Sequence, residues 1–290
     1  MQNLMPLLSF VPFGSHSWHS WSGLYAVITG FLMPRNIKLI LEYDGTNYHG
    51  WQSQQGSGMP TIQDALEAAL RKLTKGDIRT VSSGRTDAGV HALGHAANFL
   101  TESRIPAESW APALNHLLPP DIRVLASEEV RPDFHARFSA KGKQYQYLVL
   151  ARRAPSALRR NHVWHVDRKL NLAAMRRAAE VLVGKHDFSA FRSAGCSAKS
   201  PVRDLRSLAI RKKGDLVEFT LEADAFLMHM ARNIVGTLVD AGLGRFTAED
   251  VKRMLRSRDR RKAGGIAPAR GLYLTTVFYG RKSRGNGKKR

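Results

Sequence analysis

The stretch from Phe226 to Leu243 constrains the fold of this 290-residue chain more than any other segment. Apolar residues cover almost the whole circumference that it would have as a helix, and a helix that is apolar all round is buried. Arg232 lies in the middle of this stretch. A buried guanidinium keeps its proton and needs an anion beside it. The fold must therefore bring a carboxylate to Arg232.

The carboxylate has to come from elsewhere in the chain, because acids are scarce near Arg232. Asp87 is a candidate, in a loop over residues 84–91 (GRTDAGVH) that follows a short strand over 81–84. The loop glycines, Gly84 and Gly89, permit unusual backbone angles or the close approach of a ligand. A neighbouring arginine would keep the Asp87 carboxylate ionised, which is the form a nucleophile needs. The alternatives are a turn in which Asp87 only accepts backbone hydrogen bonds, and a purely structural salt bridge.

Hydrophobic periodicity predicts an α+β fold in which strands and helices recur in two sets. The first set has strands over 37–43, 81–84 and 122–130, with helices that begin at Thr61 and span 106–118. The second set has strands over 145–150, 217–221 and 272–279, with helices over 172–182 and 226–243. We therefore expect two pseudo-duplicated α/β halves, 34–139 with the Asp87 loop and 140–280.

Two segments flank these halves. The first 33 residues contain no Lys, Arg, Asp or Glu, and we interpret them as a disordered extension or as the product of a start codon upstream of Met33. Residues 281–290 form a basic tail with six Lys or Arg and no acid, which is either a disordered end or a source of nonspecific RNA affinity.

Charge favours a nucleic acid as the partner. The chain has 45 basic and 24 acidic residues and a formal net charge of +21, and such a surface attracts polyphosphate chains. A membrane surface is the competing partner, but no basic amphipathic helix with a bulky apolar face supports it. Cys196 is the only cysteine, which excludes an internal disulfide and a Cys-rich zinc site and favours the cytoplasm.

No pattern in the sequence predicts a metal or a cofactor. His91 and His95 have the spacing of a zinc helix, but residues 93–100 have the pattern of a strand. The Asp44-Gly45-Thr46 segment lacks the second acidic cluster of a phosphoryl-transfer hydrolase. No glycine-rich adenosylmethionine loop is present, which argues against an RNA methyltransferase.

Several segments resemble the successive motifs of the tRNA pseudouridine synthase A (TruA) family. They are residues 43–52 (YDGTNYHGWQ), 84–92 (GRTDAGVHA), 143–147 (KQYQY), 229–236 (HMARNIVG) and 271–274 (GLYL). The resemblance is collinear over residues 34–280, and the GRTDAGVH motif is highly specific. It implies ferredoxin-like or RRM-like halves that form a pseudouridine synthase fold with a central catalytic cleft. It also implies a homodimer and a cofactor-free isomerase that acts on uridines 38–40 of the tRNA anticodon stem-loop.

The resemblance also implies roles for individual residues. Asp87 corresponds to the nucleophile and Arg232 to the arginine that pairs with it. Arg85 corresponds to a residue that helps to flip the target base, and Tyr145 to the tyrosine that packs on the uracil. Two segments correspond to RNA-contacting stretches: Phe134, His135, Ala136, Arg137 and Phe138, and Gly195, Cys196, Ser197, Ala198 and Lys199. His135 replaces the aspartate usual in the family, so we do not assume the contact that this acid makes.

The implied chemistry agrees with the residues. Isomerisation breaks the glycosidic N–C bond and remakes it at C5, and the base must first leave the helix at a cost of about a few kcal/mol. Asp87 attacks either uracil C6 or the sugar carbon, where a carboxylate suits an oxocarbenium-like species; the sequence leaves both open. We favour packing over proton transfer for Tyr145, because a phenol is a poor base. The rival functions are a noncatalytic RNA-binding protein and a synthase with another RNA target.

Overall fold

The computed structural model describes residues 34–54 and 58–280, and from Arg35 onward they belong to one compact unit. The predictions for residues 1–33 and 281–290 lie outside the described residues. The strands are β1 (Arg35–Tyr43), β2 (Val81–Ser82), β3 (His91–Thr101), β4 (Ile122–Val130), β5 (Gly142–Ala151), β6 (Trp164–Val166), β7 (Gly184–Asp187), β8 (Val202–Lys213), β9 (Leu216–Ala223) and β10 (Leu272–Phe278). The α-helices are α2 (Ile62–Thr74), α3 (Trp110–Leu117), α4 (Leu172–Glu180), α5 (Met230–Gly242) and α6 (Ala248–Ser257).

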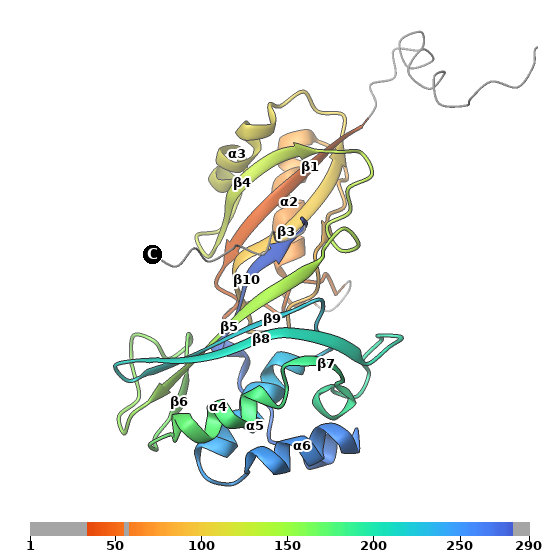
Figure 1. Cartoon of the computed structure of the whole chain (residues 1–290). Coiled ribbons are helices and arrows are strands. Elements are labelled where there is room, and N and C mark those ends of the chain that lie inside the picture. The colour runs from red at the N-terminus through yellow and green to blue at the C-terminus, as the bar shows by residue number, and fades with distance from the viewer. Residues whose placement is uncertain (1–33, 55–57, 281–290) are drawn as a thin grey trace, which may run out of the picture. The chain divides into compact units, whose positions relative to one another are not determined.

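The described strands form a 10-stranded sheet in the order β4-β1-β3-β10-β5-β9-β8-β7, with β2 beside β3 and β6 beside β5. The last strand joins the two sets of elements (Figure 1). Tyr273 and Leu274 of β10 pair with β3 in parallel on one side, and β10 pairs with β5 in antiparallel along its length on the other. The mixed α/β class is thus confirmed. A ferredoxin-like duplication and a boundary near residue 140 stay predictions.

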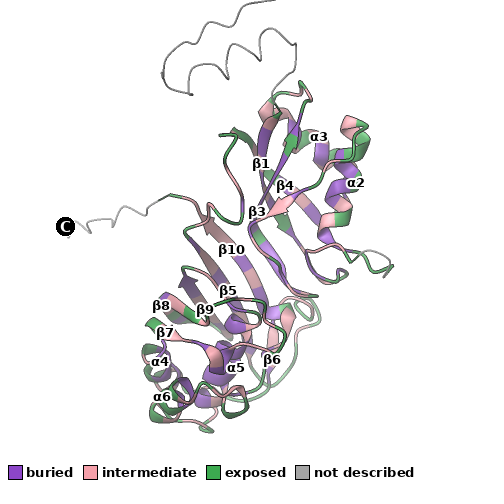
Figure 2. Cartoon of the chain, turned by 90° about the vertical axis from the view of Figure 1, so that its right-hand side faces the viewer, coloured by how far each residue is buried: buried purple, intermediate pink, exposed green. Residues whose placement is uncertain are grey.

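Helices cover the sheet in two groups. Helices α2 and α3 contact each other, and α3 packs on β4, whereas α4 packs on β8 and contacts both α5 and α6. Figure 2 shows buried residues on the strands and on the inner sides of the helices, with exposed residues on their outer sides. No described helix has the length and apolar character needed to span a bilayer.

Two helices begin later in the chain than the sequence predicts. The helix expected over 106–118 is a 3₁₀ turn at Ala107–Ser109 followed by α3. Pro112 lies in the first turn of α3, and its ring would clash with a carbonyl one turn earlier if the α-helix started sooner. The helix expected from Phe226 starts at Met230, because His229 adopts the left-handed conformation with φ 61°. Arg232 therefore lies in the first turn of α5 rather than in its middle.

Helix α6 was not predicted, although its start carries a recognisable signal. Thr247 and Asp250 form a capping box, in which each side chain accepts from the backbone N–H of the other. The helix is basic and amphipathic, which the sequence analysis did not find. Its buried residues, Val251, Met254 and Leu255, belong to the core, so this apolar face is not free for a membrane.

The segment 264–268 lies unusually close to α5, and Gly236 makes this approach possible. A Cβ atom at Gly236 would collide with the carbonyl oxygen of Gly265 and lie 3.2 Å from the Ala267 nitrogen. The Gly264 N–H donates to the Thr237 hydroxyl over 3.0 Å. These contacts hold the segment beside the residues of α5 that include Arg232.

We predict that Gly236→Ala destabilises the protein by about 1–3 kcal/mol, the range typical of overpacking. A loss of stability would be informative, because alanine in a helix interior is otherwise more stable than glycine by about 0.5–1 kcal/mol. Gly265→Ala is the control, since a Cβ atom there meets nothing within 4 Å. Urea denaturation of both variants measures the difference, and a stabilised Gly236→Ala would show that the close approach does not constrain the fold.

Candidate active site

The structure brings Asp87 and Arg232 together. One nitrogen of the Arg232 guanidinium, Nη1, donates to Asp87 Oδ2 over 2.9 Å. The Nε of the same guanidinium donates to the Ala267 carbonyl over 2.8 Å, which fixes its orientation. The Arg232 side chain is 13% exposed and that of Asp87 is 32% exposed. The pairing expected from the buried arginine is present, and the carboxylate remains accessible to a substrate.

A third group, His229, contacts the same carboxylate. Its Nε2 lies 3.3 Å from Asp87 Oδ2, and its Nδ1 lies 2.7 Å from the Ser193 hydroxyl. His229 belongs to the motif over residues 229–236, but the sequence predicted a role for neither His229 nor Ser193. The available signal was its position three residues before Arg232, which places both side chains on one side of a helix.

The segment 43–52 supports the loop that carries Asp87. The Trp51 N–H donates to the Thr86 carbonyl over 3.1 Å, and the Gly89 N–H donates to the Tyr48 carbonyl over 3.2 Å. The hydroxyls of Tyr43 and Thr86 lie 2.8 Å apart. Residues on both sides of Asp87 are therefore bound to one neighbouring segment.

Two glycines of that segment are required by this contact. A Cβ atom at Gly45 would collide with the Val90 carbonyl, and one at Gly50 would collide with the Thr86 carbonyl. Gly50 also has a φ of +87°, a backbone angle that residues with a side chain rarely adopt. The motif over 43–52 thus shapes the site by letting the Asp87 loop lie directly on its backbone.

Tyr145 faces the same site from β5. It is buried, and its ring meets Phe226 edge-on at 4.8 Å between centroids. Burial, and then the negative charge of Asp87, raise the pKa of the Tyr145 hydroxyl. The phenol therefore stays protonated at neutral pH, which agrees with packing as its main role.

Cations lie on the other side of the Asp87 loop. Arg85 is exposed. Lys143 lies beneath Gly84, where a Cβ atom would collide with its ammonium group. Burial, and then the nearby charge of Arg137, lower the pKa of Lys143 to about 8. Within residues 34–54 and 58–280, no carboxylate pairs with Lys143, so its charge is available to an anion.

The segment Phe134–Phe138 is anchored at its centre. Ala136 is buried, its N–H donates to Asn98 Oδ1 over 2.8 Å, and its carbonyl accepts from the Tyr279 hydroxyl over 2.9 Å. Arg137 is exposed and Phe138 is 73% exposed. The anchored segment therefore presents a cation and an aromatic ring to solvent.

His135 caps a turn within this segment. Its Nδ1 accepts from the backbone N–H of Arg137 over 3.2 Å and of Phe138 over 3.3 Å. An aspartate can cap a turn in the same way, with a carboxylate oxygen as the acceptor.

The second predicted RNA-contacting segment, Gly195–Lys199, lies near the start of α5. Ser197 and Lys199 are exposed, whereas Cys196 and Ala198 are partly buried against the core. Just before the segment, the Ser193 N–H donates to the Met228 carbonyl over 3.2 Å. The segment is therefore tied to the residues that carry His229.

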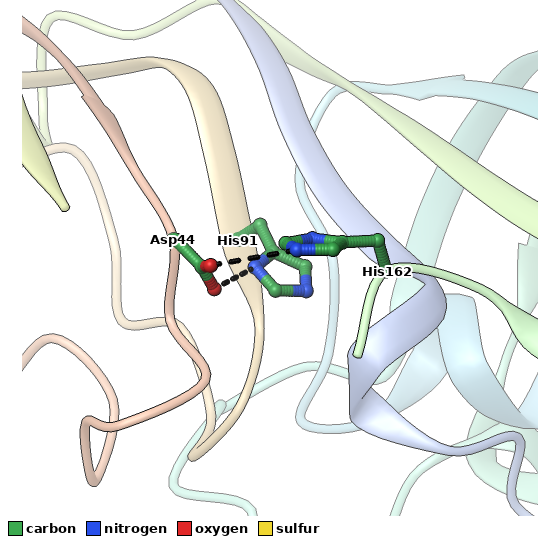
Figure 3. Close-up of side chains that lie close together, drawn as sticks. All are labelled: Asp44, His91 and His162. Atoms are coloured by element: carbon green, nitrogen blue, oxygen red, sulfur yellow. Dashed lines mark ion pairs between the residues drawn. The ribbon is translucent and has the colours of Figure 1, made fainter. Parts of the chain in front are cut away.

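Asp44, His91 and His162 form the one cluster of potential metal ligands among the described residues, with ligand atoms within 4.8 Å of one another (Figure 3). His91 Nε2 lies 3.0 Å and 3.2 Å from the carbonyls of Asn161 and Arg270, and its Nδ1 lies 3.0 Å from the Gly45 nitrogen. Both ring nitrogens are thus engaged by the backbone, and neither offers a free lone pair to a metal.

The same cluster joins distant parts of the chain. Asp44 Oδ2 lies 3.5 Å from His162 Nε2, and the His91 ring stacks on Tyr273 of β10 at 4.8 Å between centroids. Burial, its largest cause, lowers the pKa of His91, so the ring is neutral near pH 7. We conclude that the cluster is a structural link between the end of β1, the start of β3 and the segment before β6.

Comparisons with known proteins agree with the geometry. The family described as tRNA pseudouridine synthase matches residues 39–139 and 178–280. A tRNA pseudouridine synthase A of Acetivibrio thermocellus is 49% identical over 245 residues, which cover 84% of this chain and 100% of that protein. The tRNA pseudouridine synthase A of Myxococcus xanthus is 49% identical over 248 residues, which cover 85% of this chain and 92% of that protein. The tRNA pseudouridine synthase A 2 of Clostridium tetani is 47% identical over 247 residues, which cover 85% of this chain and 100% of that protein.

We predict that Lys143→Met stabilises the protein near neutral pH. Burial lowers the pKa of Lys143 to about 8, whereas a lysine of the unfolded chain titrates near about 10.4. Between these values the unfolded chain binds more protons, so the stability of the wild type rises with pH. The variant should therefore be more stable at about pH 7, and its advantage should shrink by about pH 9.5.

Urea denaturation at both pH values measures this difference, with the exposed Lys185→Met as the control. If Lys143→Met is no more stable than the wild type at neutral pH, or if its advantage grows with pH, then burial of the Lys143 ammonium does not lower the stability of the folded protein.

Proposed function

The chain belongs to the tRNA pseudouridine synthase family, and we propose that it converts uridine to pseudouridine at positions 38–40 of the tRNA anticodon stem-loop. The observation that carries this proposal is the ion pair between Asp87 and Arg232, with Nη1 and Oδ2 2.9 Å apart. The names of the curated relatives and the formal charge of +21 support tRNA as the substrate.

Asp87 is the nucleophile in this proposal. Arg232 orients its carboxylate, and a carboxylate attacks an electron-poor carbon. Attack at uracil C6 and attack at the sugar carbon both fit the accessible carboxylate. In either case the N1–C1′ bond breaks, a C5–C1′ bond forms, and the proton lost from C5 is balanced by one gained at N1. The reaction therefore needs no cofactor and no external reactant.

Arg85 and Tyr145 handle the flipped base. Extrusion of a base costs about a few kcal/mol, and the exposed Arg85, two residues from Asp87, is placed to occupy the gap or to hold the phosphate. Tyr145 packs on the freed uracil from the wall of the site. Its protonated phenol contributes shape and apolar surface.

The two predicted RNA-contacting segments extend the site. Arg137 and Lys143 supply positive charge on one side, and the exposed Phe138 ring offers a stacking surface worth about 1–3 kcal/mol for an unpaired base. On the other side, Lys199 contacts phosphate and residues Gly195–Ala198 contact RNA chiefly through their backbone.

The resemblance to the family extends the proposal to the assembly. We expect a cytoplasmic homodimer in which each chain folds as two ferredoxin-like halves around a central cleft. The observed sheet, in which β10 connects the two sets of elements, agrees with this arrangement. The boundary of the halves would fall between β4 and β5.

Tritium release tests the proposed function. Wild-type protein is incubated with unmodified tRNA that carries tritium at uracil C5, because bond formation at C5 expels this tritium. We predict release by the wild type, none by Asp87→Asn or Asp87→Ala, and unchanged tRNA binding by all three. Replacement of uridines 38–40 by cytidine in the tRNA should abolish release.

The exposed Asp167→Asn is the matched control, and it should match the wild type. Tight tRNA binding without release by the wild type would favour a noncatalytic RNA-binding protein. Release that persists after uridines 38–40 are replaced would indicate a different target uridine.

A further inference from the structure

Two side chains approach the same oxygen of Asp87. Arg232 Nη1 lies 2.9 Å from Oδ2, and His229 Nε2 lies 3.3 Å from the same atom. Within the described residues, no side chain or backbone N–H donates to Oδ1. Both contacts are therefore made to Oδ2.

The contact with Ser193 is compatible with a proton on the nitrogen of His229 that faces Asp87. A neutral imidazole has one N–H donor and one bare acceptor nitrogen. The Ser193 hydroxyl, 2.7 Å from Nδ1, can donate to a bare Nδ1, which leaves the proton on Nε2 facing Asp87. One tautomer thus satisfies the hydroxyl, the ring and the carboxylate together.

The backbone of His229 adopts the left-handed conformation at the start of α5. Its φ is 61° and its ψ is 5°, a left-handed conformation that costs a non-glycine residue about 1–2 kcal/mol. Its carbonyl also accepts from the Asn233 N–H over 2.9 Å and so begins α5. Glycine or asparagine would adopt this conformation more readily. A histidine at this position therefore costs stability, and such residues gather at functional sites.

We propose that His229, oriented by Ser193, is a positioning residue that fixes Oδ2 of Asp87 and thereby presents Oδ1 as the attacking atom. This inference rests on the proposed function. It assigns the reacting oxygen, and it gives His229 a role that acts through Asp87 rather than through the RNA.

The position of Ser193 adds a link to the RNA. Ser193 immediately precedes the segment that we expect to contact RNA, and its N–H is bound to the Met228 carbonyl next to His229. Ser193 thus lies between His229 and the segment that we expect to contact RNA.

The test compares variants by tritium release in single turnover at saturating enzyme, by tRNA affinity and by thermal melting. His229→Asn keeps a residue that tolerates the left-handed backbone but is too short to reach Asp87. His229→Gln is long enough to place an amide N–H where Nε2 lies. Ser193→Ala removes the orienting hydroxyl and leaves the histidine. His116→Asn on the exposed surface of α3 is the matched control.

We expect His229→Asn to lower the single-turnover rate by about 10- to 100-fold, the scale of a misplaced reacting group. Its tRNA affinity and melting temperature should stay close to those of the wild type. His229→Gln should recover most of the lost rate, Ser193→Ala should lose roughly tenfold, and His116→Asn should be unchanged.

Three results would overturn the inference. The first is a wild-type rate in His229→Asn or in Ser193→Ala. The second is a loss in His229→Asn that tracks a lower melting temperature or weaker tRNA binding and is not rescued by glutamine. The third is a wild type that releases no tritium from any tRNA, which would refute the proposed function itself and the inference with it.

Discussion

The charge pair between Asp87 and Arg232 is the interaction on which the rest of this structure depends. The two residues lie 145 positions apart in the chain, one in a loop before β3 and the other in the first turn of α5. A guanidinium in a mostly apolar helix is stable only beside an anion. The fold must therefore hold both elements in place, and the chemical result is a carboxylate that is paired with a cation and partly accessible.

Several separate features of the fold hold Asp87 and Arg232 in place. Gly45 and Gly50 let the Asp87 loop lie against residues 43–52, and Gly236 lets the Ala267 carbonyl reach the Arg232 guanidinium. Strand β10 pairs with both β3 and β5 and so joins the strands that flank the site. These close backbone contacts place residues remote from the carboxylate in its support.

The sequence predicted a structural feature correctly where its pattern was compatible with only one arrangement. A buried arginine without a neighbouring acid predicted its pairing with Asp87, and alternation predicted the strand at Ile122–Val130. The predicted helix starts were wrong where a single residue prevents helical geometry. The left-handed His229 delays the start of α5, and Pro112, in the first turn of α3, prevents an earlier start of that helix. The contact of His229 with Asp87 was missed, although the position of His229 three residues before Arg232 was a signal for it. Its contact with Ser193 joins segments whose proximity only the fold creates.

A double-mutant cycle on Asp87 and Arg232 tests the central claim most directly. The free energy of unfolding is measured in urea for the wild type, Asp87→Asn, Arg232→Met and the double variant. If each charge is held for the other, the double variant is more stable than the two single losses predict, with a coupling of about 0.5–3 kcal/mol. Losses that add to within about 0.3–0.5 kcal/mol would contradict the claim, because two residues that do not interact behave in that way.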